Sequence, residues 1–156
     1  MLRKTVYIGA DSAGYEMKQG LIAHLREEGY EVIDCGCNST ASCHYPEFAH
    51  AVASKVSEEP DSVFGILVCG TGIGMSMAAT KHRRVRAAVC SETYSARFTR
   101  MHNNANVLCM GARVIGPGLA QDITDIFLST EFESGGRHEA RVDMITAIED
   151  AEAKKF

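Results

Sequence analysis

Two patterns of apolar positions alternate along the chain. Short runs that are rich in apolar or β-branched residues predict strands at 5–10, 30–35, 64–69, 86–90 and 107–110. The segments that follow them predict helices at 15–28, 47–57, 75–81, 94–102, 119–128 and 137–154. The prediction is clearest at 15–28 and 47–57, where apolar residues recur three and four apart and so share one helix face.

Strict alternation of strands and helices predicts an α/β fold, because parallel strands need helical crossovers. We expect a doubly wound, Rossmann-like sheet of five parallel strands with helices on both faces. The length of 156 residues fits one domain spanning 1–156. The last helix, at about 137–154, is long and ends in a polar stretch, so we expect it to pack on a partner subunit.

Composition excludes several classes of protein. With 46% apolar and 23% charged residues, the chain is typical of a globular protein, and no apolar run approaches the roughly 20 residues that span a bilayer. The segment Met1–Lys4 is too short for a signal peptide, so a cytoplasmic location without a membrane partner is expected. The net charge of -4 argues against a nucleic-acid partner, and the basic run 81–86 is interpreted as a solvated helix end.

Six cysteines do not predict a disulfide framework here, because the chain is long enough to build a core. Cys90 and Cys109 lie in apolar runs and are expected in that core. A zinc site stays open as an alternative at four potential ligands, although structural sites usually space paired cysteines more widely; these are Cys35, Cys37, Cys43 and His44.

The segment Cys69–Gly74 closes the third predicted strand and holds three glycines, Gly70, Gly72 and Gly74. Such a loop brings backbone N–H groups close to an anion, and the helix that follows favours negative charge. The spacing fits neither a Walker loop nor a dinucleotide fingerprint, which leaves a general anion hole or a plain tight turn. Cys69 stands where a helix N-terminus favours the thiolate, so it is a candidate base or nucleophile, or else a buried strand cysteine.

Two further groups carry candidate chemistry. His102 can shuttle a proton and Asn103 can donate to an oxyanion, unless both simply cap a helix. Arg137 and Arg141 are four apart on one helix face and could clamp a dianion, unless they pair with neighbouring acidic residues. Together with the glycine loop, these groups suit an enediolate mechanism on a phosphorylated sugar, which needs neither a cofactor nor a metal.

Several motifs, in order along nearly the whole chain, resemble ribose-5-phosphate isomerase B, the family that includes the galactose-6-phosphate isomerase subunits. They are Gly9-x-Asp11-x-Ala13-Gly14-x-x-x-Lys18, Tyr45-Pro46, Cys69-Gly-Thr-Gly-Ile-Gly74, His102-Asn103-x-Ala105-Asn106-Val107, Gly111-x-Arg113 and Gly136-Arg137-His138-x-x-Arg141-Val142.

The resemblance implies a role for each matching residue. Cys69 looks like the general base that moves a proton between carbons 2 and 1, and His102 like the residue that opens the furanose ring. The enediolate would be stabilised by Thr71, by the Gly70–Gly74 amides and by Asn103. Some family members place a glutamate base where this chain has Met75, so the cysteine mechanism is implied. The residues expected to bind substrate are Asp11, Ser12, Tyr45, Gly70, Gly72, Gly74, Arg113, Arg137 and Arg141.

Substrate identity stays open between two sugar sizes. Many ribose-type members carry Asp-His and Asp-Tyr-Pro where this chain has Asp11-Ser12 and His44-Tyr45-Pro46, which look more like the galactose-type subunits. Those subunits divide the catalytic residues between two chains, whereas this chain holds a full set. The leading hypothesis is interconversion of ribose 5-phosphate and ribulose 5-phosphate. An isomerase of allose or galactose 6-phosphate and a non-catalytic sugar-phosphate-binding protein remain the alternatives.

Topology predicts an assembly. Cys69 ends a strand, at the carboxyl edge of the sheet, whereas His102 precedes a strand and so lies at the amino edge. A five-residue strand is about 17 Å long, too far for both side chains to act on one sugar. We therefore expect a homodimer whose shared sites take Cys69 from one subunit and His102 from the other, with pairing into tetramers left open.

Overall fold

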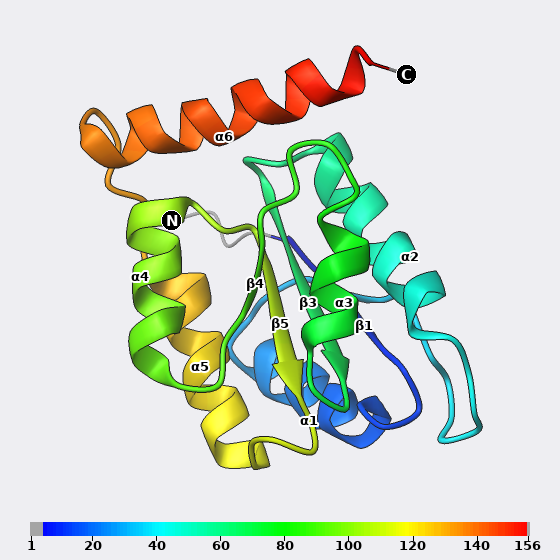
Figure 1. Ribbon diagram of the computed structural model, residues 1–156. Coiled ribbons are helices and arrows are strands. Elements are labelled where there is room, and N and C mark those ends of the chain that lie inside the picture. The colour runs from blue at the N-terminus through cyan, green and yellow to red at the C-terminus, as the bar shows by residue number, and fades with distance from the viewer. Residues whose placement is uncertain (1–4, 156) are drawn as a thin grey trace.

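The computed structural model describes residues 5–155 and has a parallel β-sheet covered by helices on both faces (Figure 1). In that part of the chain the sheet has five strands in the order β2-β1-β3-β5-β4, and all neighbours are parallel. The strands are β1 (Thr5–Ala10), β2 (Val32–Asp34), β3 (Val63–Cys69), β4 (Ala87–Val89) and β5 (Val107–Gly111). The helices are α1 (Tyr15–Glu27), α2 (Tyr45–Glu58), α3 (Ile73–Ala79), α4 (Thr93–Asn103), α5 (Pro117–Ser129) and α6 (Arg137–Ala153).

The predicted α/β fold is confirmed, and every predicted strand and helix is present close to its expected bounds. The largest differences are in the edge strands: β2 and β4 have three residues each, where the sequence predicted six and five. An edge strand pairs on one side only, so fewer of its residues are held in the ladder than in a central strand. The central strand β3 is buried along all seven residues.

Each face of the sheet has its own core. On one face, α1, α4 and α5 pack their apolar sides against the strands, with Leu25, Ala96 and Phe127 fully buried. On the other face, α2 and α3 do the same through residues such as Val52 and Met75. Both Cys90 and Cys109 lie in these cores, as predicted. Because helices cover both faces of the sheet, a ligand can reach it at the ends of the strands.

The sixth helix does not cover a face. In Figure 1, α6 crosses over the amino end of the strands, at the end of the sheet opposite the strand tips. Near its C-terminal end the Asp150 carboxylate pairs with Arg83 at 2.7 Å and with Arg84 at 3.3 Å, and Glu149 accepts a hydrogen bond from the Arg84 backbone N–H. The basic run was expected to be a solvated helix end, and its arginines do keep access to water, with 61% of the Arg83 side chain exposed. In addition, two of these arginines attach α6 to the turn before β4.

Within residues 5–155, every helix is too short or too polar to span a lipid bilayer. Met1–Lys4, on which the expectation of no signal peptide rests, lies outside the described residues. The expected cytoplasmic location therefore stays a prediction.

A buried ion pair joins the first helix to the edge of the sheet. The Lys18 side chain on α1 is fully buried, and its Nζ donates to both carboxylate oxygens of Asp34 at 2.6 and 2.8 Å. The same carboxylate accepts a hydrogen bond from the Gly36 N–H at 2.9 Å and is 29% exposed. The two charges are thus unequally placed, since only Asp34 keeps access to water.

This asymmetry predicts different costs for removing each partner. Asp34→Ala leaves the Lys18 ammonium buried and unpaired, so the free energy of unfolding should fall by about 3–5 kcal/mol. Lys18→Met leaves Asp34 partly hydrated and replaces the buried stem with an apolar chain, so its cost should be clearly smaller. Urea unfolding at matched protein concentration measures both variants. Equal losses would show that the burial of Lys18 does not control the energy of the pair.

Candidate active site

The carboxyl edge of the sheet brings together most of the predicted substrate-binding residues. The chain leaves β1 toward β2 on one side and reaches β3 on the other, so a topological switch point lies between β1 and β3, where ligands bind in open α/β sheets. Cys69 ends β3, and Asp11 follows β1 and donates its N–H to the Val68 carbonyl at 3.1 Å. Gly14 in turn donates its N–H to the Asp11 carboxylate at 3.1 Å. Asp11 and its neighbour Ser12, both half-buried, therefore lie beside the end of β3.

The glycine loop 70–74 is held against β5 by direct backbone contact. Gly72 has φ of 80°, and a Cβ there would lie 2.9 Å from the Met110 carbonyl carbon. Gly111 mirrors it, since a Cβ at that position would lie 2.8 Å from the Thr71 backbone. No side chain fits between the two segments. The N–H of Gly72 points back at Cys69 and donates to its Sγ at 3.0 Å.

Two predicted ligands flank this loop in the same chain. The turn after β5 folds back, with the Arg113 N–H donating to the Gly70 carbonyl at 3.0 Å. The Arg113 side chain then lies over Gly70, where an added Cβ would be 3.6 Å from the guanidinium. On the other side of the loop, Tyr45 at the start of α2 packs its ring against Gly74. A Cβ added at Gly74 would lie 2.7 Å from the Cζ atom of that ring. An anion at the loop would thus meet one cation and one phenol.

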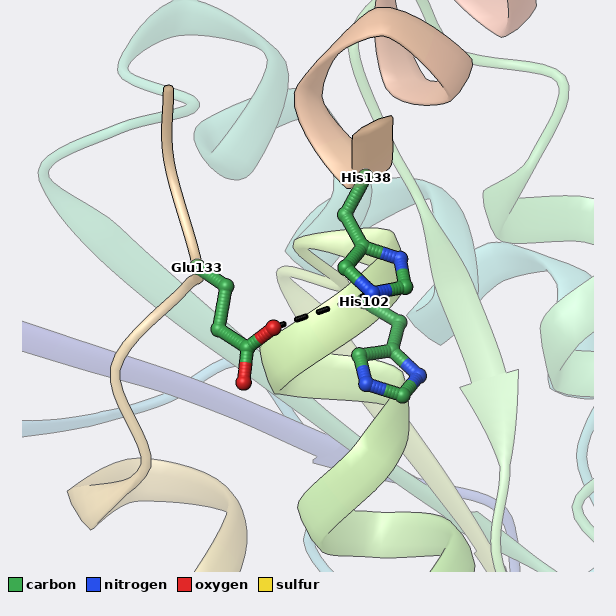
Figure 2. Close-up of side chains that lie close together, drawn as sticks. All are labelled: His102, Glu133 and His138. Carbon is green, nitrogen blue, oxygen red and sulfur yellow. Dashed lines mark ion pairs between the residues drawn. The ribbon is translucent and has the colours of Figure 1, made fainter. Parts of the chain in front are cut away.

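A second group of predicted residues gathers at the opposite, amino edge. His102 is in the last turn of α4, and His138 is in the first turn of α6. Their rings stack in parallel, 3° apart in plane and 3.9 Å between centroids, and Phe98 packs on His102 at 4.9 Å. Figure 2 shows the Glu133 carboxylate directed at His138, with an Oε2–Nε2 distance of 3.7 Å. The sequence motif contains His138 without assigning it a role, and nothing in the sequence singles out Glu133, which lies in the loop before α6.

Arg137 and Arg141 belong to the same group. Arg137 Nε approaches His138 Nε2 at 3.5 Å. Within residues 5–155 neither arginine forms the ion pair with Glu139 or Asp143 that the sequence left open, and Glu139 instead accepts a hydrogen bond from the Gly135 N–H. Both exposed guanidinium groups stay available for an anionic ligand.

Burial lowers the pKa of His138, and the nearby His102 and Arg137 lower it further, against the smaller opposing effect of Glu133. His138 therefore resists protonation and offers a neutral ring to the face of His102.

The end of α4 is held in place by Arg100, a buried side chain that donates to the Ala105 carbonyl at 2.6 Å and to the Asn104 side-chain oxygen at 2.9 Å. Burial lowers the pKa of Arg100 to about 10, which leaves it charged at neutral pH.

A cleft of about 770 Å³ runs beneath α6 beside this second group. It includes Asn103, the predicted enediolate donor, and its lining is otherwise largely apolar, with residues such as Val85, Ala87, Ile145 and Ile148. Neither Cys69 nor the glycine loop borders it. The predicted site residues therefore fall into two groups on one chain, one at each end of the strands, separated by the length of β3, about 20 Å for a seven-residue strand.

The zinc alternative at the four residues Cys35, Cys37, Cys43 and His44 gains no support. Within residues 5–155 these side chains do not converge as a metal-binding group, and the three that do are His102, Glu133 and His138, whose ligand atoms lie within 4.8 Å of one another. That group suits a cation poorly. The imidazole rings of His102 and His138 are stacked in parallel planes, so a ring nitrogen from each cannot point at the same ion. Arg137 and Arg141 also place positive charge beside the group, which disfavours a cation.

Known proteins resemble the chain over almost its whole length. The model of a family described as Ribose/Galactose Isomerase matches residues 6–145. Ribose-5-phosphate isomerase B of Escherichia coli (strain K12) is 49% identical over 147 residues, which cover 94% of this chain and 97% of that protein. The solved structure of ribose-5-phosphate isomerase B from Mycoplasma genitalium with bound ribulose-5-phosphate superposes with a TM-score of 0.91 at 40% identity, covering 94% of this chain and 96% of that one. The Clostridium thermocellum ribose-5-phosphate isomerase B gives 0.90 at 45% identity, covering 95% and 99%.

The lowered pKa of His138 makes stability depend on pH. Since the folded protein binds this proton less readily than the unfolded chain, its contribution is complete above the ordinary histidine value near 6.5 and is lost as pH falls below it. The melting temperature should therefore drop between about pH 7 and pH 5 by a smaller amount in His138→Gln than in the unsubstituted protein. Melting curves across this range make the comparison, and parallel profiles would contradict it.

Proposed function

The chain belongs to the ribose/galactose isomerase family, and on that premise we propose that it interconverts ribose 5-phosphate and ribulose 5-phosphate through an enediolate. As a family member it is an aldose–ketose isomerase of the ribose-5-phosphate isomerase type. One observation carries the residue assignments: each edge of the sheet holds half of the groups that this reaction needs. The Cys69 edge has a base and an anion-binding loop, and the His102 edge has a proton shuttle and two arginines.

Cys69 is the proposed general base. In the open-chain sugar its thiolate removes the proton from carbon 2 and returns it to carbon 1, while a proton moves between the two oxygens. The Gly72 N–H donates to the Cys69 Sγ at 3.0 Å and so holds the sulfur beside the loop. Burial raises the pKa of Cys90 to about 11 and also raises that of Cys109, so neither competes for this role. Met75, which replaces the glutamate of some family members, is fully buried in the core between α2 and α3.

The remaining roles follow from the same division. Thr71, the loop amides and Asn103 would stabilise the negative charge that develops on the enediolate oxygens. His102, held between Phe98 and the neutral His138, would move the proton that opens the furanose ring. Arg113 would bind the phosphate from the loop side, and Arg137 and Arg141 would bind it from the other.

These roles require two chains in each site. Cys69 and His102 lie at opposite edges of one sheet, yet both must contact a single sugar at about 3 Å. We infer a homodimer in which the Cys69 edge of one subunit faces the His102 edge of its partner, with α6 in the contact. Exposed apolar side chains support this arrangement, since Met144, Ile145 and Ile148 lie uncovered on α6 and Met77 on α3.

Replacing the base tests the chemistry. Cys69→Ala should lower the turnover of ribose 5-phosphate by about 10² to 10⁴-fold, because it removes the proposed acceptor of the carbon-bound proton. Cys90→Ala is the matched control, since it also removes a buried thiol but leaves the site intact. A coupled assay on five- and six-carbon sugar phosphates measures both variants. Higher turnover of allose or galactose 6-phosphate would move the substrate to the six-carbon alternative, and binding without turnover by the unsubstituted protein would favour the non-catalytic one.

Complementation tests the shared site. Cys69→Ala and His102→Ala proteins, each inactive alone, are mixed in equal amounts after reversible dissociation. Half of the dimers formed are mixed dimers, each with one intact and one doubly damaged site, so about a quarter of the unsubstituted activity should return.

The control mixes Cys69→Ala with the double variant Cys69→Ala/His102→Ala, where no pairing rebuilds a site. Mixed dimers demonstrated by mass spectrometry but without activity would refute the division of the site between subunits.

A further inference from the structure

The segment between β2 and α2 holds two cysteines that the proposed reaction does not use. Cys37 is buried and fixed to the sheet, since its N–H donates to the Ala10 carbonyl at 2.9 Å, one residue before Asp11. Its thiol donates to the Ser39 carbonyl at 3.2 Å. Cys43 is half-buried and comes two residues before Tyr45, the first residue of α2.

The two thiols are neighbours within one short segment. Cys37 and Cys43 are both free, and their side chains are close enough to share a hydrogen bond. The five residues between them, 38–42, are all exposed, so this part of the loop can adjust without disturbing a core. Cys35 is directed elsewhere, because its thiol approaches the Ile33 carbonyl at 3.9 Å.

We propose that Cys37 and Cys43 are a modification site, which forms a reversible disulfide with a low-molecular-weight disulfide such as oxidised glutathione. The more accessible Cys43 thiolate attacks one sulfur of the oxidant and expels a glutathione thiolate. Deprotonated Cys37 then attacks Cys43 Sγ of the mixed disulfide and expels the second. Two protein thiols are oxidised, one oxidised glutathione is reduced to two glutathione molecules, and these take up the two thiol protons.

Accessibility decides the order of the two steps. Burial raises the pKa of Cys37, which makes it a slow first nucleophile but leaves it beside Cys43 for the closing step. That step is intramolecular, so proximity compensates for the small fraction of thiolate.

Forming the bond must move one side of the loop. A disulfide is about 2.05 Å long, which is shorter than a hydrogen bond between two sulfurs, so the two Sγ atoms must approach each other. Cys37 is held by β1, whereas Cys43 has an exposed loop on one side, so Cys43 should move. The chain that moves with it leads directly to Tyr45, whose ring packs on Gly74 of the glycine loop. Oxidation should therefore shift Tyr45 off the loop and weaken sugar-phosphate binding, a consequence that rests on the proposed function.

Differential alkylation tests the modification itself. The full-length Cys35→Ser protein is equilibrated with oxidised and reduced glutathione at several ratios, its free thiols are blocked, and the remaining sulfurs are labelled with a second reagent after reduction. We expect the second label on Cys37 and Cys43 together, with a loss of two hydrogen atoms in the intact mass that dithiothreitol reverses. Labelling of other cysteines while these two stay free, or stable mixed disulfides without closure, would overturn the proposal.

Kinetics test the coupling to Tyr45. The KM for ribose 5-phosphate should rise severalfold on oxidation of the Cys35→Ser protein and return with dithiothreitol. The Cys37→Ser/Cys43→Ser protein should keep its KM in the same buffers, which excludes oxidation of Cys69 as the cause. A disulfide that forms without any change in KM would refute the coupling. A protein that isomerises no sugar phosphate would instead refute the proposed function, while the mass measurement still decides the disulfide.

Discussion

Backbone contact between the glycine loop and the end of β5 is the constraint on which the site depends. Gly72 and Gly111 allow the two segments to meet with no side chain between them, and this fixes where the loop amides, Cys69 and Arg113 lie relative to one another. A Cβ at either position would meet backbone, which cannot turn aside as a flexible side chain can. The central strand β3 carries this constraint into the core, because all seven of its residues are buried.

The second group of proposed site residues depends on how helix ends are held at the amino end of the strands. Arg100 fixes the last turn of α4 by bonding to carbonyl and amide oxygens there, and α6 is attached to the turn before β4 through Asp150. His102 and His138 stack where these two helices meet. The orientation of the His102 ring therefore depends on tertiary contacts from two helices and a loop. A change in any of these contacts would alter that orientation.

The sequence predicted the order and type of the helices and strands well, because apolar periodicity and glycine positions report directly on a parallel sheet. It also placed Cys69 and His102 at opposite edges, since the position of a residue before or after a strand decides this without coordinates. It could not place Arg113 over Gly70, which depends on a turn after β5, or bring Glu133 to His138, which depends on the path of an irregular loop. It also could not show that the exposed basic run pairs with α6, because the partners on α6 are more than 60 residues away in the sequence.

The separation of the two groups along one sheet has a consequence for how such a chain diverges. The Cys69 group and the His102 group share no side chain and are supported by different elements, so losing one leaves the packing of the other unchanged. After a gene duplication, one copy could lose the proposed base, Cys69, and the other the proposed proton shuttle, His102, and each would still fold. Only the mixed pair would then retain the proposed shared site. The proposed pair of identical chains would then be one substitution in each copy away from obligate dependence on a sister subunit.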